Sequence, residues 1–286
     1  MSPLSRKSGA RGRTASRVLT SVPSVALFDA HLQPDGLAQS DLETLARFGV
    51  TAALLPAHAG NTRADAEALL AHFRDLSQVQ AGRLLRAGIR PFLALGVPAG
   101  CAPPQDLDRV LDLLPETAGE SRVVAIGLIG LGDGAPEAER LFARQLELAV
   151  ELDLPAVIEV GSIERVRLLR RTLALLRESG IAPGRVLLAR AQEADLKVVL
   201  GCGHLAGLSV RSGRVQPTQA VAAVRAYGPA QLVLGSDAGS GASDLLALPR
   251  TADALQAAGL SEPIVRRVTG ENAAALLRVD LGALKT

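Results

Sequence analysis

The sequence is poor in aromatic residues and in cysteine. It contains five Phe, one Tyr and no Trp among 286 residues. Proteins that hold unpaired bases stack them on aromatic side chains, so this composition disfavours nucleic acid as a partner of the folded body. The two cysteines, Cys101 and Cys202, lie far apart and belong to no Cys-x-x-Cys or Cys-His pattern. This spacing disfavours a zinc ribbon and a disulfide framework, and we expect two free, buried thiols.

Long apolar runs are also absent. No segment reaches the length needed to cross a bilayer, and the first residues lack the continuous apolar stretch of a secretory signal. We therefore expect a cytoplasmic protein without a membrane partner.

Acidic residues are missing from the first 24 positions. This segment carries five of the 31 basic residues amid Ser, Gly and Thr, which predicts a basic disordered tail. Without it, 26 basic residues face 29 acidic ones, so the remaining body has a net charge near −3 although the whole chain has +2. The basic character belongs to the tail, and we expect one folded domain over residues 25–286.

What the body does contain is an alternation of short apolar runs with longer amphipathic stretches. The runs are continuous rather than alternating, as in parallel strands that are buried on both faces. Eight strand-then-helix pairs predict an α/β fold, a (β/α)8 TIM barrel, with extra C-terminal helices from about residue 261. A doubly wound open sheet is the alternative, but no Gly-x-Gly-x-x-Gly turn follows the first run. The predicted strands are 25–29, 50–57, 90–97, 122–131, 154–160, 185–190, 204–210 and 231–237.

Two of the predicted helices are preceded by a residue pattern that is typical of a helix N-terminus. Ser40 and Glu43 have the spacing of a capping box. Ser162 precedes a longer apolar stripe that starts with Ile163 and Val166, so we expect a helix there with these two side chains on its buried face.

Candidate functional residues follow from the barrel topology. The active site of a TIM barrel lies at the carboxyl ends of its strands, so the residues that end each apolar run should face one cavity. This selection gives His31, Gln33, His58, Leu128, Glu159, Arg190 and Asp237.

Five segments then carry a resemblance to a known family. In their order, spacing and residue types they are similar to the metal-site segments of the TatD-like metal-dependent hydrolases in the amidohydrolase superfamily. The resemblance runs from about residue 25 to 276. It implies a TIM barrel with a two-metal site at its mouth and hydrolysis as the activity. The segments are FDAHLQP at 28–34, VVAIGLIGL at 123–131, LPAVIEVG at 154–161, RVLLARA at 185–191 and LVLGSDAGSG at 232–241.

The sequence departs from the family at most of the metal-binding positions. Where the family has His-x-His after the first strand, this chain keeps His31 but has Gln33, and the Gly-Val-His-Pro of the third strand has lost its histidine. Leu128 stands where the family has a bridging glutamate. The histidines of strands five and six fall on Glu159 and Arg190, while Asp237 is retained.

These replacements disfavour a two-metal centre, and we expect no metal cofactor. Two divalent ions need a bridging carboxylate and several imidazoles, whereas a leucine supplies no donor and an arginine is a permanent cation. Our main hypothesis is that Arg190 replaces the ions electrostatically by pairing with Glu159 and Asp237. The chain would then be a catalytically inactive TatD-like barrel, a pseudoenzyme, with a structural, regulatory or ligand-binding role toward an unknown small molecule or protein.

Two alternatives use the same end of the barrel. His31, Glu159 and Asp237 could hold one zinc, manganese or magnesium ion, since three protein ligands suffice for a catalytic metal. Asp237 would then be a catalytic base in the hydrolysis of phosphoester or amide bonds. In the second alternative Arg211 and Arg214, in the loop at 209–217, bind an anion together with the glycine-rich loop at 235–244.

Overall fold

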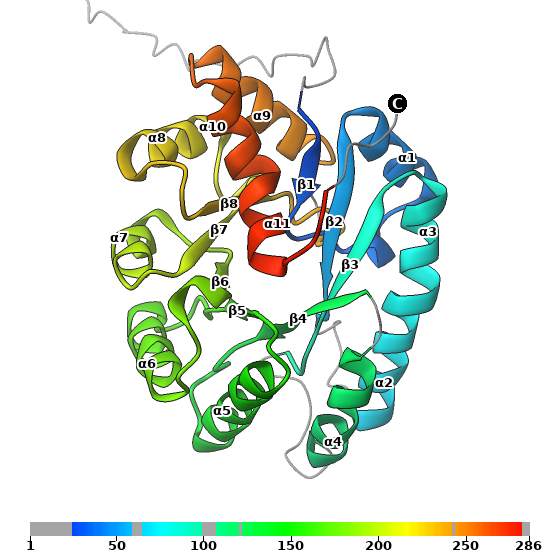
Figure 1. Ribbon diagram of the computed structural model, residues 1–286, viewed down its shortest axis with the longest axis vertical. Helices are drawn as coiled ribbons and strands as arrows, with labels where there is room; N and C mark the ends of the chain where they lie inside the picture. Colours follow the sequence, from blue (N-terminus) through cyan, green and yellow to red (C-terminus); the bar gives the residue numbers. More distant parts are fainter. Residues whose placement is uncertain (1–24, 59–64, 99–106, 120–121, 242–243, 282–286) are drawn as a thin grey trace, which may run out of the picture.

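The computed structural model describes residues 25–58, 65–98, 107–119, 122–241 and 244–281. The predicted basic tail and Cys101 lie outside the described residues. Eight parallel strands form one sheet in sequence order, and the helices surround it, so the predicted TIM barrel is confirmed (Figure 1). The strands are β1 (Leu27–Asp29), β2 (Val50–Pro56), β3 (Arg90–Leu95), β4 (Val123–Ile129), β5 (Ala156–Glu159), β6 (Val186–Ala189), β7 (Leu205–Ser209) and β8 (Leu232–Gly235).

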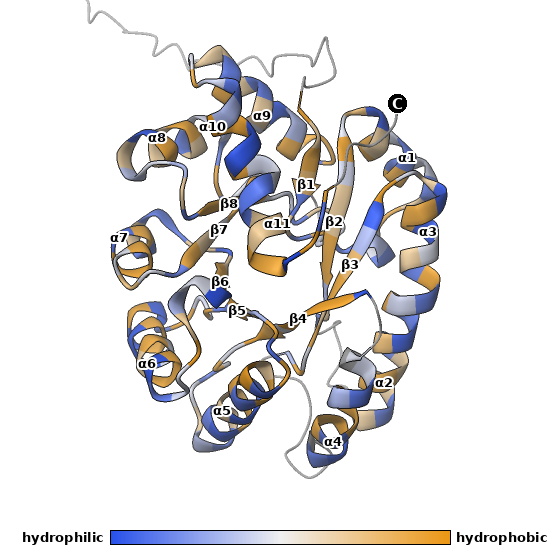
Figure 2. Ribbon diagram, in the orientation of Figure 1, coloured by the Kyte–Doolittle hydropathy of each residue, from blue (hydrophilic) through white to orange (hydrophobic). Residues whose placement is uncertain are grey.

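The helices follow the strands as the amphipathic stretches predicted. Each presents an apolar stripe to the sheet, whereas the strands are apolar along most of their length (Figure 2). None of the helices among the described residues is long and apolar enough to span a membrane. The α-helices are α1 (Gln39–Arg47), α2 (Ala66–Arg74), α3 (Ala81–Arg86), α4 (Leu107–Ala118), α5 (Pro136–Glu151), α6 (Arg165–Glu178), α7 (Glu193–Gly201), α8 (Pro217–Tyr227), α9 (Ala247–Ala257), α10 (Glu262–Arg266) and α11 (Asn272–Leu277). Shorter turns of helix are η1 (Pro34–Gly36), η2 (Asp75–Gln80), η4 (Pro183–Arg185) and η5 (Arg267–Glu271).

The first and last strands meet at a seam. The Ala30 amide donates to the Leu234 carbonyl at 3.3 Å, and the Asp237 amide donates to the His31 carbonyl at 2.9 Å. Backbone groups buried in a barrel need partners, and these bonds supply them where the two ends of the sheet come together. The seam therefore places the segments after β1 and β8 side by side at the carboxyl end of the barrel.

The amino end of the barrel is closed by the C-terminal helices. From α11, Ala273, Leu276 and Leu277 join the apolar cluster that fills the barrel interior, where Phe28 stacks on Phe92 at 5.7 Å between ring centroids. This location agrees with the extra helices predicted from residue 261. The amino end is therefore filled with apolar side chains, whereas the candidate polar residues lie at the carboxyl ends of the strands.

Both helix beginnings predicted from capping signals were wrong. Helix α1 starts at Gln39 after the N-cap residue Ala38, and the carboxylate of Asp41 accepts from the Ala38 amide at 2.9 Å. Ser40 is therefore inside the helix, where the Thr44 hydroxyl donates to its carbonyl. The capping-box pattern is short, and Asp41, two residues before Glu43, forms the equivalent contact with Ala38.

The stripe predicted for the helix after Ser162 was wrong at its beginning. Helix α6 starts at Arg165, and Ile163 and Val166 are 81% and 66% exposed. The buried face starts at Leu168 instead. Cys202 is also exposed, in contrast to the expected buried thiol, because it is the C-cap residue of α7 at the surface.

Candidate functional site

The turns after β6 and β8 place the two central residues of the site. Arg190 directly follows β6, and Asp237 lies two residues beyond β8. Both adopt the left-handed conformation, with φ of 53° and 56°. This conformation costs a non-glycine residue about 1–2 kcal/mol, so the contacts that the two side chains make have to offset it.

Arg190 joins three of the predicted site residues. Its Nη1 donates to Glu159 Oε1 at 2.7 Å, and its Nε and Nη2 donate to Asp237 Oδ1 at 3.1 Å and 2.6 Å. Its Nη2 also lies 3.4 Å from His31 Nε2. Burial lowers the pKa of the guanidinium, but the charges of Glu159 and Asp237 outweigh it and raise the pKa above the ordinary value. A permanent cation therefore occupies the centre of the barrel mouth.

Asp237 is almost completely buried and accepts from two arginines. It is 1% exposed, and its Oδ2 accepts from Arg211 Nη1 at 3.2 Å. Burial raises the pKa of the carboxyl, but the neighbouring His31, Arg190 and Arg211 outweigh burial and hold the pKa below its usual value. Asp237 is thus ionised at neutral pH, with both oxygens engaged.

His31 stays neutral in this setting. Burial, helped by the charge of Arg190, lowers the pKa of its imidazole to about 3 despite Asp237 at 3.3 Å. Its Nδ1 is buried and has no hydrogen-bond partner among the described residues. A neutral imidazole can accept from Arg190 through Nε2, which makes His31 the third acceptor around that guanidinium.

A second buried acid lies behind the mouth and was missed from the sequence. Asp29 is fully buried at the end of β1, and it accepts from the His31 amide at 3.1 Å and from the Ser236 amide at 2.8 Å. The Ser236 hydroxyl also hydrogen bonds to its other oxygen. Burial raises the pKa of Asp29 to about 6 although these bonds oppose the shift. The pair ties β1 to the segment after β8.

The remaining candidates do not join the charged centre. Leu128 is 4% exposed and belongs to the apolar interior. Gln33 is buried beside the segment after the last strand, where its backbone N–H donates to the Ala238 carbonyl. His58 contacts Asp35 through Nε2 at 3.1 Å, and its amide donates to His72.

A glutamine supports the end of β3, where the family has its histidine. Gln145 on α5 is 1% exposed, its Oε1 accepts from the Val97 amide at 2.6 Å, and its Nε2 donates to the Val97 carbonyl at 3.3 Å. A polar residue on the buried face of a predicted helix was the available signal for this contact, and the sequence reasoning did not use it.

These residues do not fit a two-metal centre. Within the described ranges, no three His, Cys, Asp or Glu side chains gather as a group that could hold a metal ion. Leu128 offers no donor atom at the bridging position, and Arg190 and Arg211 occupy the oxygens of Asp237. The predicted single-metal set of His31, Glu159 and Asp237 is likewise arranged around a guanidinium, which an ion would have to displace.

Comparison with known proteins places this site in a wider context. No family model matches the chain. An uncharacterized metal-dependent hydrolase of Methanocaldococcus jannaschii is 27% identical over 255 residues, which cover 88% of this chain and 100% of that protein.

Solved structures agree with the sequence comparison. A TatD-like protein from Archaeoglobus fulgidus has a TM-score of 0.74 at 27% identity and covers 88% of this chain and 100% of its own. The TatD homolog YjjV from Escherichia coli has a TM-score of 0.63 at 20% identity, covering 89% of this chain and 98% of its own, and shows the shared fold. In sequence the chain is similar to a metal-dependent hydrolase and to a TatD-like protein, and it shares its barrel fold with TatD-like structures.

Proposed function

We propose that this chain is a TatD-like barrel in which Arg190 takes the electrostatic place of the divalent ions, and that it binds a ligand at its mouth without metal-dependent hydrolysis. The observation that carries the proposal is the guanidinium of Arg190, which donates to Glu159 at 2.7 Å and to Asp237 at 2.6 Å. A metal ion at this place would meet a fixed positive charge at hydrogen-bond distance from its ligands.

The chemistry of the remaining groups supports the same conclusion. Metal-dependent hydrolysis at neutral pH needs a bound ion that lowers the pKa of water to about 7. Asp237, the acid best placed to act as a base, accepts hydrogen bonds from Arg190 and Arg211 through its two carboxylate oxygens. The groups at this mouth can hold and orient a polar ligand, since Arg190 and Arg211 pair with Glu159 and Asp237 and Arg214 lines the hollow beside them.

The competing function is a hydrolase that uses one metal ion at His31, Glu159 and Asp237. Elemental analysis of protein purified without chelators, and then offered zinc, manganese or magnesium, separates the two. We expect less than stoichiometric metal and no difference between the wild-type chain and Asp237→Ala. Stoichiometric metal that is lost in Asp237→Ala, together with phosphoesterase or amidase activity, would overturn the proposal.

A gain-of-function variant makes the test sharper. The combined change Gln33→His, Leu128→Glu and Arg190→His restores three family residues at the mouth, and we expect it to bind metal where the wild-type chain does not. The matched control is Gln33→His alone, which adds an imidazole but keeps the guanidinium, and it should bind none. Metal binding by this control would show that Arg190 does not exclude the ion.

A further inference from the structure

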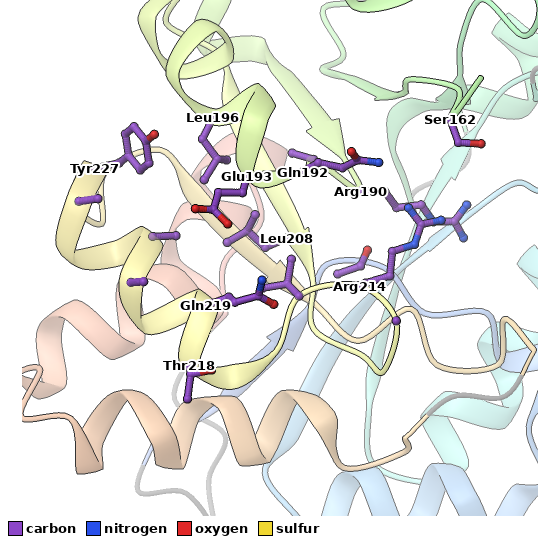
Figure 3. A pocket seen from close by; sticks show the side chains of 17 residues that line it. Ser162, Arg190, Gln192, Glu193, Leu196, Leu208, Arg214, Thr218, Gln219 and Tyr227 are labelled. Carbon is purple, nitrogen blue, oxygen red and sulfur yellow. The ribbon is translucent and has the colours of Figure 1, made fainter. Parts of the chain in front are cut away.

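A cavity of about 740 Å³ opens beside the charged centre, on the outside of β7. It lies between α7 and α8 and reaches Arg190 at its inner end (Figure 3). Helix α8 packs against α9, and this leaves space on the side of α8 that faces α7. Pockets of roughly 300–1,000 Å³ are the usual size for small-molecule sites, so this one is large enough for a ligand.

The walls of the cavity are mainly apolar. Leu196 from α7 and Leu208 from β7 line it and are 1% and 2% exposed. Helix α8 contributes Ala222 and Ala226, which line the cavity and are exposed. Because alanine side chains are short, the space next to this face of α8 is left unfilled, and an apolar group placed there would lose contact with water.

One end of the cavity is cationic. Arg190 and Arg214 lie at this end, and Tyr227 lies at the opposite end (Figure 3). Arg214 and Arg190 also line a smaller hollow of about 410 Å³ together with Asp237, so the two spaces share these arginines. Within the described part of the chain, Arg190 and Arg211 are paired with carboxylates, whereas the Arg214 side chain makes no hydrogen bond or ion pair.

The polar groups along the walls refine the kind of ligand. Glu193, in the first turn of α7, and Gln219, in the first turn of α8, both line the cavity. A carboxylate on the wall repels an anionic group but accepts from a hydroxyl or an amine. The anionic group of a ligand is therefore favoured at Arg214 and disfavoured beside Glu193.

We propose that this cavity binds a small organic anion with an apolar body. Its carboxylate or phosphate head pairs with Arg214, and its body lies along Leu196, Leu208 and the alanines of α8 toward Tyr227. This proposal rests on the proposed function, in which the mouth of the barrel binds a ligand, and it adds the chemical class of that ligand. Charge-assisted hydrogen bonds to a guanidinium give the head its specificity, and burial of the body gives most of the affinity.

The composition of the chain supplies a reporter for this cavity. Tyr227 is the single tyrosine of the chain, which has no tryptophan, so tyrosine emission comes from the cavity wall alone. The test titrates the full chain with octanoate, octyl phosphate, octanol and inorganic phosphate. We expect a saturable change in emission with the two amphipathic anions, at least tenfold weaker binding of octanol, and no saturable response to inorganic phosphate.

Two variants with matched controls locate the site. Arg214→Ala should weaken octanoate binding at least tenfold, whereas Arg86→Ala, an exposed arginine on α3, should leave it unchanged. Ala222→Phe should fill the cavity and abolish binding, whereas Ala71→Phe, at an exposed alanine of α2, should not. Melting temperatures of all four variants confirm that each is folded.

Several outcomes would overturn the proposal. Equal affinity for octanol and octanoate, octanoate binding that survives Arg214→Ala, or a response to inorganic phosphate alone would each contradict an amphipathic anion site. Absence of binding both in emission and in calorimetry would do the same. Metal binding that depends on Asp237 would instead contradict the proposed function and leave the octanoate result standing, so the two failures are distinguishable.

Discussion

The two ends of this barrel are closed in different ways. At the amino end, α11 inserts Leu276 and Leu277 into the interior, and the closure is apolar. At the carboxyl end, Arg190 is surrounded by Glu159, Asp237 and His31, and the closure is made of charges and hydrogen bonds. The apolar end needs only the right side-chain volumes, whereas the polar end depends on every partner being present, because a buried charge that loses its partner is strongly destabilising.

Removal of the central cation should have the largest effect on this comparison. Arg190→Ala leaves Glu159 without its guanidinium and Asp237 with Arg211 alone, so we expect a loss of about 3–5 kcal/mol in the free energy of unfolding. The double variant with Glu159→Ala should lose less, because it removes one of the stranded charges. Denaturant unfolding of both variants checks this, and equal or larger losses in the double variant would contradict the pairing.

Truncation at the apolar end should have the next largest effect. Leu276→Ala removes a side chain that is 4% exposed in the interior cluster, and we expect a loss of about 3 kcal/mol from transfer and cavity formation. The loss should be independent of salt. Leu85→Ala is the control, since Leu85 is 47% exposed on α3 and should cost much less. A salt-dependent loss at Leu276 would blur the contrast between the two ends.

The buried acid behind the mouth predicts a pH dependence. The folded-state pKa of Asp29, about 6, is above its ordinary value of 3.8, so the neutral form is favoured by folding. Its stabilising contribution is present at low pH and is lost as the pH rises through about 6. In Asp29→Asn the side chain has nearly the shape of the protonated acid but does not titrate.

We therefore expect the free energy of unfolding of Asp29→Asn to rise relative to that of the wild-type chain between pH 4 and pH 8. The expected change in this difference is up to about 3 kcal/mol for a pKa shift of this size. His31 titrates in the opposite sense, since its pKa is lowered to about 3, but it is present in both proteins and cancels in the difference. Denaturant unfolding at several pH values measures the effect. A difference between the two proteins that stays constant with pH would show that Asp29 is ionised throughout.

The smallest expected effect concerns a residue outside both ends. Ile163→Ser changes a side chain that is 81% exposed before α6, so the free energy of unfolding should change by no more than about 0.5 kcal/mol. Thermal unfolding of this variant beside Leu168→Ser, on the buried face, tests where the apolar face of the helix begins. Similar losses of free energy of unfolding in the two variants would support a buried face that begins at Ile163, as predicted from the sequence.

The strands could be predicted from the sequence because each is a continuous apolar run of the length that a buried parallel strand needs. The order of these runs fixed which residues end neighbouring strands, so the meeting of Glu159 on β5 with Arg190 after β6 could be anticipated. Helix beginnings were less predictable. The pattern of Ser40 and Glu43 predicted the start of α1, but the Asp41 carboxylate accepts from the Ala38 amide at that end instead.

The finer contacts of the site could not be predicted. Arg211 was considered only as part of an alternative anion site, and its contact with Asp237 at 3.2 Å depends on how the loops after β7 and β8 approach one another. Asp29 escaped notice because it reads as the last position of an apolar run, and its partner Ser236 is 207 residues away in the chain. Long-range partners of a buried polar group follow from packing, which a local pattern does not contain.

The seam between the first and last strands has a consequence for assembly of the molecule. Asp29 is made early in synthesis and meets Ser236 only after seven further strands have followed it. Until that docking event its carboxyl is solvated and titrates as in an open chain. In mildly acidic solution the Asp29 carboxyl should therefore take up a proton as the barrel is completed, while burial of the His31 imidazole releases one, so closure of the seam redistributes protons between two residues of the same segment.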